Sequence, residues 1–147
     1  MKIGQSCITL NGVTWIKEDI LFEGRVNVSN IEALHLAKKY KARVPNSDDY
    51  KKLLKLSHKF IPETKEWIFA ETNEELKKGF NVLRFKFNGW IYVQSDDRNM
   101  TTASYWCDLN DIEDEYASFL FFNEHKVQSP SNIRVQDFLF SLKLIKL

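Results

Sequence analysis

Glycine and proline are scarce in this chain, which has five glycines and three prolines among its 147 residues. Neither a Walker loop nor a G-x-G-x-x-G pattern occurs, so the sequence offers no glycine-rich cradle for phosphates. No glycine- and serine-rich linker, internal repeat or low-complexity block divides the chain. Its length suits one ordinary domain, so we expect residues 1–147 to form a single compact unit.

Cysteine and histidine are also few. The two cysteines, Cys7 and Cys107, form no C-x-x-C pair, and the histidines, His35, His58 and His125, lack the spacing of metal ligands. Two free, partly buried thiols in a reducing compartment are favoured over a disulfide. Isolated surface histidines are likewise favoured over a zinc site built from scattered His and Cys ligands. We therefore expect no bound metal and no cofactor.

Long apolar runs and an excess of one charge are both missing. No run approaches the length of a membrane span, and the first fifteen residues lack the apolar core of a secretory signal. The 21 basic and 20 acidic residues leave a net charge of +1, which gives no broad attraction to nucleic acid or anionic lipid. We expect no nucleic-acid partner and no membrane insertion. The expected location is the cytoplasm or a virion, or outside the cell if a signal has been removed.

Aromatic residues are abundant, at 14% of the chain. The hydrophobic fraction of 44% and the charged fraction of 28% are near globular averages, so a packed core is feasible. Trp15, Trp67 and Trp106 lie inside apolar runs and are expected in this core. Trp90 and Tyr92 alternate with aliphatic residues, so one of the two sets should face away from the core.

Helix signals come early in the chain. Ser29 and Glu32 form a capping box, which predicts a helix that starts at Ser29 and ends near Tyr40. Ser47 is expected to cap a second helix. Its predicted apolar face contains Tyr50, Leu53, Leu54 and Phe60.

Strand signals follow later. Residues 81–87 alternate between apolar and charged side chains, and we expect them to form a β-hairpin with residues 90–93 across Asn88-Gly89. Asn11-Gly12 predicts another hairpin near the N-terminus. Further strands are predicted at 104–107, 116–122 and 138–145. Helices first and antiparallel strands later indicate an α+β fold.

The acidic run at 108–115 (DLNDIEDE) contains carboxylates that are typical calcium ligands. It lacks the spacing and the glycine of an EF-hand loop, so a solvated loop between two strands is the expected structure.

Five short patterns together resemble one family. They occur in the same order as in the Fibrobacter succinogenes major paralogous domain. They are 12–20 (GVTWIKEDI), 43–45 (RVP) with the following Asp49, Tyr50 and Leu53, 79–80 (GF), 105–108 (YWCD) and 141–146 (SLKLIK).

The resemblance implies a C-type-lectin-like fold, in which two helices lie beside a short irregular antiparallel sheet with long loops and the chain ends are close together. Calcium-dependent lectins of this fold carry an acidic or amide residue before a proline, whereas none of the three prolines here follows such a residue. The resemblance therefore implies calcium-independent binding.

We expect a non-enzymatic binding module for a protein or a cell-surface glycan, such as a receptor-binding protein encoded by a phage. The expected contact residues lie in the late loops and on the exposed sheet face. They are Trp90, Tyr92, Asp96, Asp97, Arg98, Asn99, Tyr105, Asp108, Asn110 and Asp111. The first alternative is a structural virion component, a tail or capsid adaptor or decoration protein that assembles with copies of itself. The second is a metal-dependent enzyme of the formylglycine-generating type.

Overall fold

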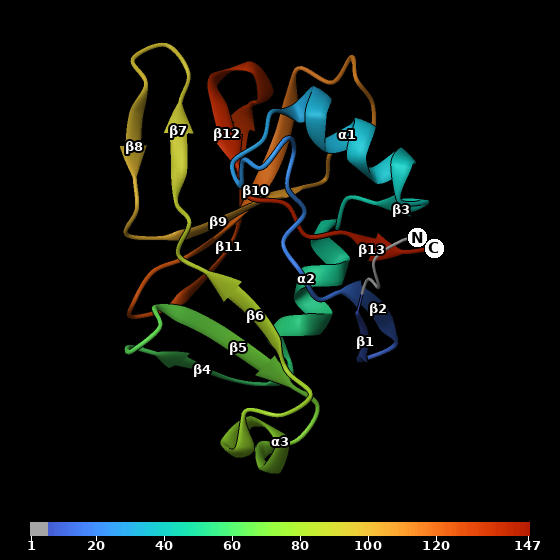
Figure 1. Ribbon diagram of the computed structural model, residues 1–147, viewed down its shortest axis with the longest axis vertical. Helices are drawn as coiled ribbons and strands as arrows, with labels where there is room; N and C mark the ends of the chain where they lie inside the picture. The colour runs from blue at the N-terminus through green and yellow to red at the C-terminus, as the bar shows by residue number, and fades with distance from the viewer. Residues whose placement is uncertain (1–5) are drawn as a thin grey trace.

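The computed structural model describes the chain from Ser6 to Leu147, without the side chains of residues 127–131. Within this range it is an α+β structure, in which a few short helices accompany four small antiparallel sheets (Figure 1). The α+β class predicted from the sequence is therefore confirmed.

The helices are α1 (Asn30–Lys39), α2 (Ser47–Leu54) and α3 (Asn73–Lys78), with a 3-10 turn at Val135–Asp137. The strands are β1 (Cys7–Leu10), β2 (Val13–Ile16), β3 (Ala42–Arg43), β4 (Ser57–Ile61), β5 (Glu66–Ala70), β6 (Leu83–Lys86), β7 (Trp90–Tyr92), β8 (Asp97–Asn99), β9 (Ala103–Cys107), β10 (Tyr116–Phe122), β11 (Val127–Arg134), β12 (Phe138–Phe140) and β13 (Ile145–Lys146).

Helix α1 confirms the predicted capping box. Ser29 caps the helix by accepting a hydrogen bond from the Glu32 N–H, while the Glu32 carboxylate accepts one from the Ser29 N–H. Lys39 is the last helical residue, and Tyr40 caps the C-terminus.

Helix α2 differs from the prediction at both ends. Asn46, not Ser47, is its N-cap, in a capping box with Asp49. The helix ends at Leu54, so Phe60 lies on strand β4 instead of the helix. The predicted apolar face was wrong there because Phe60 alternates along a strand and packs on Trp67, at a ring distance of 5.9 Å.

The C-terminal strand lies beside the N-terminal hairpin. β1 and β2 form the predicted hairpin around Asn11-Gly12, and β13 pairs with both β2 and β3 (Figure 1). The predicted strand 138–145 is interrupted, since β12 ends at Phe140 and β13 begins at Ile145. Between them Ser141 forms an isolated parallel bridge with Tyr105 of β9.

The predicted hairpin across Asn88-Gly89 is wrong. β6 pairs with β5, whereas β7 pairs with β12 and β8, so Asn88-Gly89 is a crossing between two sheets. Gly89 has φ +67°, and a Cβ atom there would lie 1.6 Å from the main-chain oxygen of Asn99. Glycine is therefore required at this crossing by a close approach of two chain segments.

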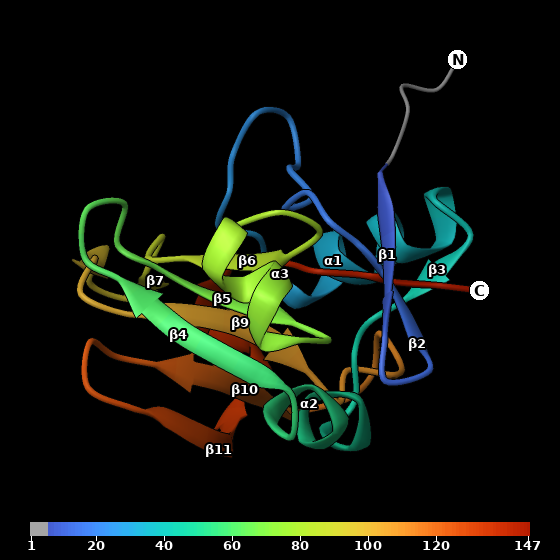
Figure 2. The same ribbon diagram turned by 90° about the horizontal axis from the view of Figure 1, so that it is seen from below.

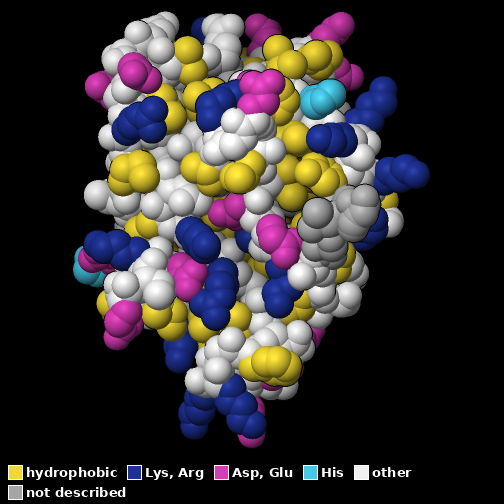
Figure 3. Space-filling view, viewed as in Figure 1, with side chains coloured by type: hydrophobic (Ala, Val, Ile, Leu, Met, Phe, Trp, Pro, Cys, Tyr) yellow, Lys and Arg dark blue, Asp and Glu magenta, His cyan; other side chains and the backbone are white. Residues whose placement is uncertain are grey.

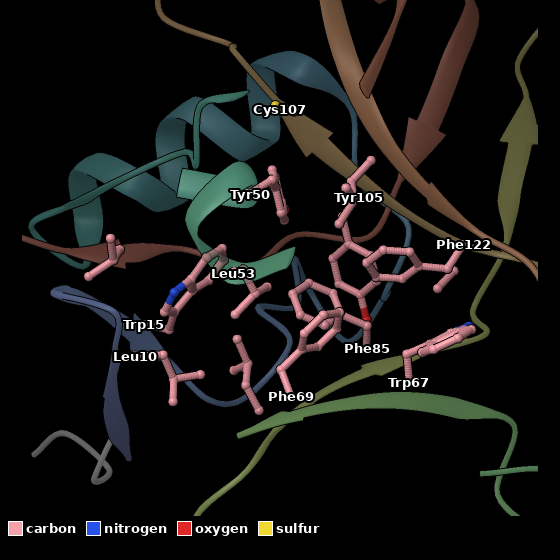
Figure 4. Packing of buried hydrophobic residues seen from close by; sticks show 14 of the residues in the cluster. Leu10, Trp15, Tyr50, Leu53, Trp67, Phe69, Phe85, Tyr105, Cys107 and Phe122 are labelled. Atoms are coloured by element: carbon pink, nitrogen blue, oxygen red, sulfur yellow. The ribbon is translucent and has the colours of Figure 1, made fainter. Parts of the chain in front are cut away.

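Strand β9 divides the apolar core into two parts. Tyr105 faces a cluster that also contains Trp15, Phe85 and Phe122, and the rings of Phe85 and Tyr105 meet edge to face at 4.9 Å (Figure 4). Trp106 points to the other side, into a cluster formed with α1 and the C-terminal segment. Every residue of β9 is buried, so this strand is the centre of the fold.

Candidate ligand-binding groove

A groove of about 780 Å³ lies between the segment that follows β2 and the segment that joins α3 to β6. Figure 2 shows the first of these as the blue loop at the upper edge of the molecule. The lining residues are Lys17, Glu18, Asp19, Leu21, Val26, Gly79, Phe80, Asn81, Val82, Arg84, Lys86, Asn88 and Lys143. This volume falls in the range of small-ligand sites, about 300–1,000 Å³.

The base of the groove is organised around the Asp19 carboxylate. Oδ1 accepts from Lys143 Nζ at 3.0 Å, and the Tyr105 hydroxyl donates at 3.0 Å to both oxygens. Asn88 Nδ2 donates to Oδ2 at 3.0 Å. Lys143 also donates to the carbonyl of Lys17. These bonds join four segments that are distant in sequence, so they fix the shape of the groove.

Burial shifts the pKa values of Lys143 and Tyr105, the two titratable partners of Asp19. It lowers the pKa of Lys143, which is 2% exposed, and the Asp19 charge opposes this effect. Burial also raises the pKa of Tyr105 well above its ordinary value, and the negative charge of Asp19 raises it further. The Tyr105 hydroxyl therefore stays protonated and remains a donor to Asp19.

The Asn88-Gly89 crossing forms one end of the groove. Asn27, which is buried, donates from Nδ2 to the carbonyls of Asn88 and Gly89, at 3.4 and 3.2 Å. Because Asn88 binds Asp19 through its side chain, the crossing is held from both sides. The asparagine that indicated a turn in the sequence is thus part of the groove.

Two lysines of the groove carry unpaired charge. In the described part of the chain, no ion pair involves Lys17 or Lys86, whereas Arg84 is paired with Glu66 at 2.6 Å. Glu18 accepts a hydrogen bond from the Ser6 N–H. Basic and acidic side chains lie close together over β6 in the space-filling view (Figure 3). The groove therefore presents more unmet positive than negative charge.

Apolar side chains border the charged ones. Leu21 and Phe80 line the groove from different segments and are 47% and 72% exposed, respectively. Val26 and Val82 line it as well. Large apolar side chains that are this exposed beside charges are typical of a recognition surface.

The groove contains none of the ten residues predicted from the sequence. Six of them lie on the β7–β8 hairpin. Trp90 and Tyr92 are half-buried, with ring centroids 5.4 Å from Phe138. Asp96, Asp97 and Arg98 are exposed, and Asn99 accepts hydrogen bonds from the main chain and hydroxyl of Thr101.

Tyr105 was wrongly placed among the exposed residues. Its side chain is fully buried, because its ring packs against Phe85 while its hydroxyl binds Asp19. Tyr105 therefore does not line the groove, but its hydroxyl holds the Asp19 carboxylate in position at the base of the groove.

The last three predicted residues lie in the β9–β10 loop, which is separate from the β7–β8 hairpin in Figures 1 and 2. The Asp108 carboxylate accepts hydrogen bonds from the N–H and hydroxyl of Ser47, at 2.8 and 2.5 Å. Asp108 therefore holds the start of α2. Asn110 and Asp111 are exposed, and their N–H groups donate to Asp114.

Burial alone would raise the pKa of Asp108, but several hydrogen bonds, led by those from Ser47, together outweigh it. The pKa of Asp108 therefore lies below its ordinary value. Burial also raises the pKa of the neighbouring Cys107 thiol, and the negative charge of Asp108 adds to this effect. Cys107 is a buried thiol on β9, while Cys7 is exposed on β1.

Sequence reasoning missed Asp19, Lys143, Lys17 and Lys86 as site residues. One signal was present: Lys143 interrupts an apolar run, and a charge inside such a run needs a buried partner. The identity of that partner was not visible, since Asp19 lies far away in the chain.

Comparison with known proteins finds no matching family model, no similar curated protein and no similar solved structure. The described residues include no group of three or more His, Cys, Asp or Glu side chains placed to hold a metal ion. None of the described helices has the length and apolar character needed to cross a membrane.

Proposed function

We propose that this protein is a recognition module that binds an anionic ligand with a neighbouring apolar group in the groove. The observation that carries the proposal is the pair of unpaired lysines, Lys17 and Lys86, beside the exposed Leu21 and Phe80. Two ammonium groups favour a ligand with carboxylates, and the apolar side chains favour an adjacent apolar group. A protein segment or an acidic glycan has this chemistry.

The proposal includes a C-type-lectin-like fold. Its support is the pairing of β2 with the C-terminal β13 and the position of α1 and α2 after the first hairpin. The segment 105–108, one of the patterns that resemble the family, lies on or next to the central strand β9.

The test is a titration of the isotope-labelled protein with two anionic probes, followed by NMR. One probe is a capped heptapeptide of alternating glutamate and valine, and the other is an oligogalacturonate. We expect at least one to shift the resonances of groove residues. In the double variant Lys17→Glu/Lys86→Glu the affinity should fall about tenfold, since two favourable charges become repulsive.

The matched control is Lys51→Glu/Lys52→Glu on α2, which changes the net charge equally at two exposed lysines outside the groove. Its affinity should stay within about twofold of the wild type, because exposed distant charges are screened. The proposed function is wrong if neither probe binds, or if both double variants lose affinity equally.

A further inference from the structure

Strand β6 is an edge strand whose free side borders the groove. In the sheet order β4-β5-β6, β6 has a hydrogen-bonded partner on one side only. Its residues Arg84 and Lys86 line the groove. An edge strand offers main-chain N–H and C=O groups to any extended chain that can lie beside it.

The hydrogen-bond pattern shows which main-chain groups face outward. The Phe87 N–H donates to the Lys65 carbonyl, which continues the β5–β6 ladder. The Lys86 N–H instead donates to the Tyr105 hydroxyl. Along a strand, the main-chain N–H and C=O groups of successive residues point alternately toward and away from the neighbouring strand. The N–H and C=O of Arg84 therefore point away from β5, like the N–H of Lys86.

Arg84 therefore offers a donor and an acceptor at the open edge. Within the described part of the chain, neither of these two main-chain groups makes a hydrogen bond. At Lys86, the next outward-facing residue, the main-chain N–H is already bound to the Tyr105 hydroxyl. The free edge is thus short, and it lies between the apolar Val82 and the unpaired charge of Lys86.

We propose that an extended segment of a partner protein, with acidic side chains at alternate positions, binds in the groove as an added strand on β6. This inference rests on the proposed function and names its ligand. One residue of the segment would exchange hydrogen bonds with the N–H and C=O of Arg84. Directly opposed residues of a sheet point to the same face, so its side chain meets the basic groove face of β6. Glutamate is therefore favoured at this position, and apolar residues at the alternate ones.

Main-chain pairing, not charge, favours a protein segment over an acidic glycan here. A polypeptide can pair with both main-chain groups of Arg84 in ladder geometry while it places carboxylates near Lys17 and Lys86. The basic side chains on β6 also discourage the pairing of this edge strand with a basic segment, because like charges repel. A heptapeptide of alternating lysine and valine should therefore not bind, and it serves as the negative control.

The first experiment compares Arg84→Pro with Arg84→Ala. Both remove the guanidinium and its pair with Glu66, but only proline removes the main-chain N–H. That N–H is not used by β5, so the ladder is retained in both variants and their melting temperatures should be similar. We expect the heptapeptide to bind Arg84→Pro about fivefold more weakly than Arg84→Ala, the value of one hydrogen bond.

The second experiment keeps the protein unchanged and methylates the peptide nitrogens. Methylation of the glutamate nitrogens should reduce affinity about tenfold or more, since these N–H groups face β6, while methylation of the valine nitrogens should change it by less than about twofold. This test remains valid even if Arg84→Pro does not fold.

The outcomes separate the two proposals. Suppose that binding of the heptapeptide requires Lys17 and Lys86, but that methylation of neither the glutamate nor the valine nitrogens weakens it. Strand addition is then wrong, while the proposed function of the groove stands. The same holds if only oligogalacturonate binds. If no anionic probe depends on the two lysines, both proposals are wrong.

Discussion

Asp19 and Asp97 are the same residue type in two surface regions, yet their surroundings are opposite. Asp19 lies at the base of the groove, where Lys143, Tyr105 and Asn88 bind its carboxylate. Asp97 lies on the β7–β8 hairpin, where it is exposed and opposes Tyr92 through the main chain. The groove is therefore fixed by buried polar bonds, while the hairpin is held mainly by its ladder and by Phe138.

The difference shows how a candidate site is distinguished from an exposed surface. Exposed charges on a hairpin adjust their positions, so they are poor at holding a small ligand in one orientation. In the groove, the supporting bonds order the walls before a ligand arrives. Four predictions test this contrast, in order of decreasing change in stability.

Removal of the Asp19 charge should have the largest effect. Asp19→Asn leaves Lys143 buried without a counter-charge, and we expect a loss of about 3–5 kcal/mol in the free energy of unfolding. Denaturant unfolding measures it. Asp97→Ala is the control and should change stability by less than about 0.5 kcal/mol. A similar effect at both positions would contradict the contrast drawn between the two regions.

Substitution of the crossing glycine should come next. In Gly89→Ala the new Cβ would meet the Asn99 main-chain oxygen, and alanine would adopt a positive φ. We expect a loss of about 3 kcal/mol from the overlap and the backbone strain together. Gly12→Ala has a φ of +80° but nothing within 4 Å, so it should lose only the strain, about 1 kcal/mol. Thermal unfolding of both variants separates overlap from strain.

Asp108 should show a smaller effect that depends on pH. Asp108→Asn keeps an oxygen acceptor and tolerates the positive φ at this position, but loses the charge that strengthens the hydrogen bonds from Ser47 at the start of α2, which should cost about 1 kcal/mol at neutral pH. Since the folded-state pKa of Asp108 is lowered, its stabilising effect is complete above the unfolded pKa of about 3.9. It is lost as pH falls through the folded pKa.

Urea unfolding of wild type and Asp108→Asn from pH 7 to pH 2 measures this dependence. The difference in free energy between them should be constant at neutral pH and should shrink below about pH 4. A difference that grows on acidification would show that the carboxylate destabilises the folded state.

The smallest effect is expected on the hairpin. Arg98→Ala removes an exposed side chain on β8 and should change the free energy of unfolding by less than about 0.5 kcal/mol. Affinity for the glutamate–valine heptapeptide should also stay within about twofold, because Arg98 does not line the groove. A loss of peptide affinity here would move the binding surface from the groove to the hairpin.

Local signals predicted much of the fold. The capping box of Ser29 and Glu32, the turn at Asn11-Gly12 and the alternation of β6 depend on neighbouring residues, and each appears where the sequence placed it. Asn88-Gly89 had the same local signal as Asn11-Gly12 but a different outcome. Its neighbours pair with strands far along the chain, so tertiary pairing overrode the turn preference.

The candidate site was less predictable for the same reason. The sequence drew attention to exposed polar loops and to alternating aromatics, which are properties of single segments. The groove comes instead from separate segments, and its key residues look ordinary in the sequence, as a lysine before a glutamate or an asparagine before a glycine.

The α+β class, the start of α1 and the first hairpin follow from local sequence, because capping, turn preference and alternation act over a few residues. The contacts of Asp19 with Tyr105, 86 residues away, and with Asn88, 69 residues away, depend on long-range packing that local sequence does not encode. Burial makes an unpaired charge costly, so a charged group in the core needs a partner, and the fold supplies it from whichever segment lies beside it. Asp19 and Lys143 meet this requirement for each other, and their contact forms the base of the groove.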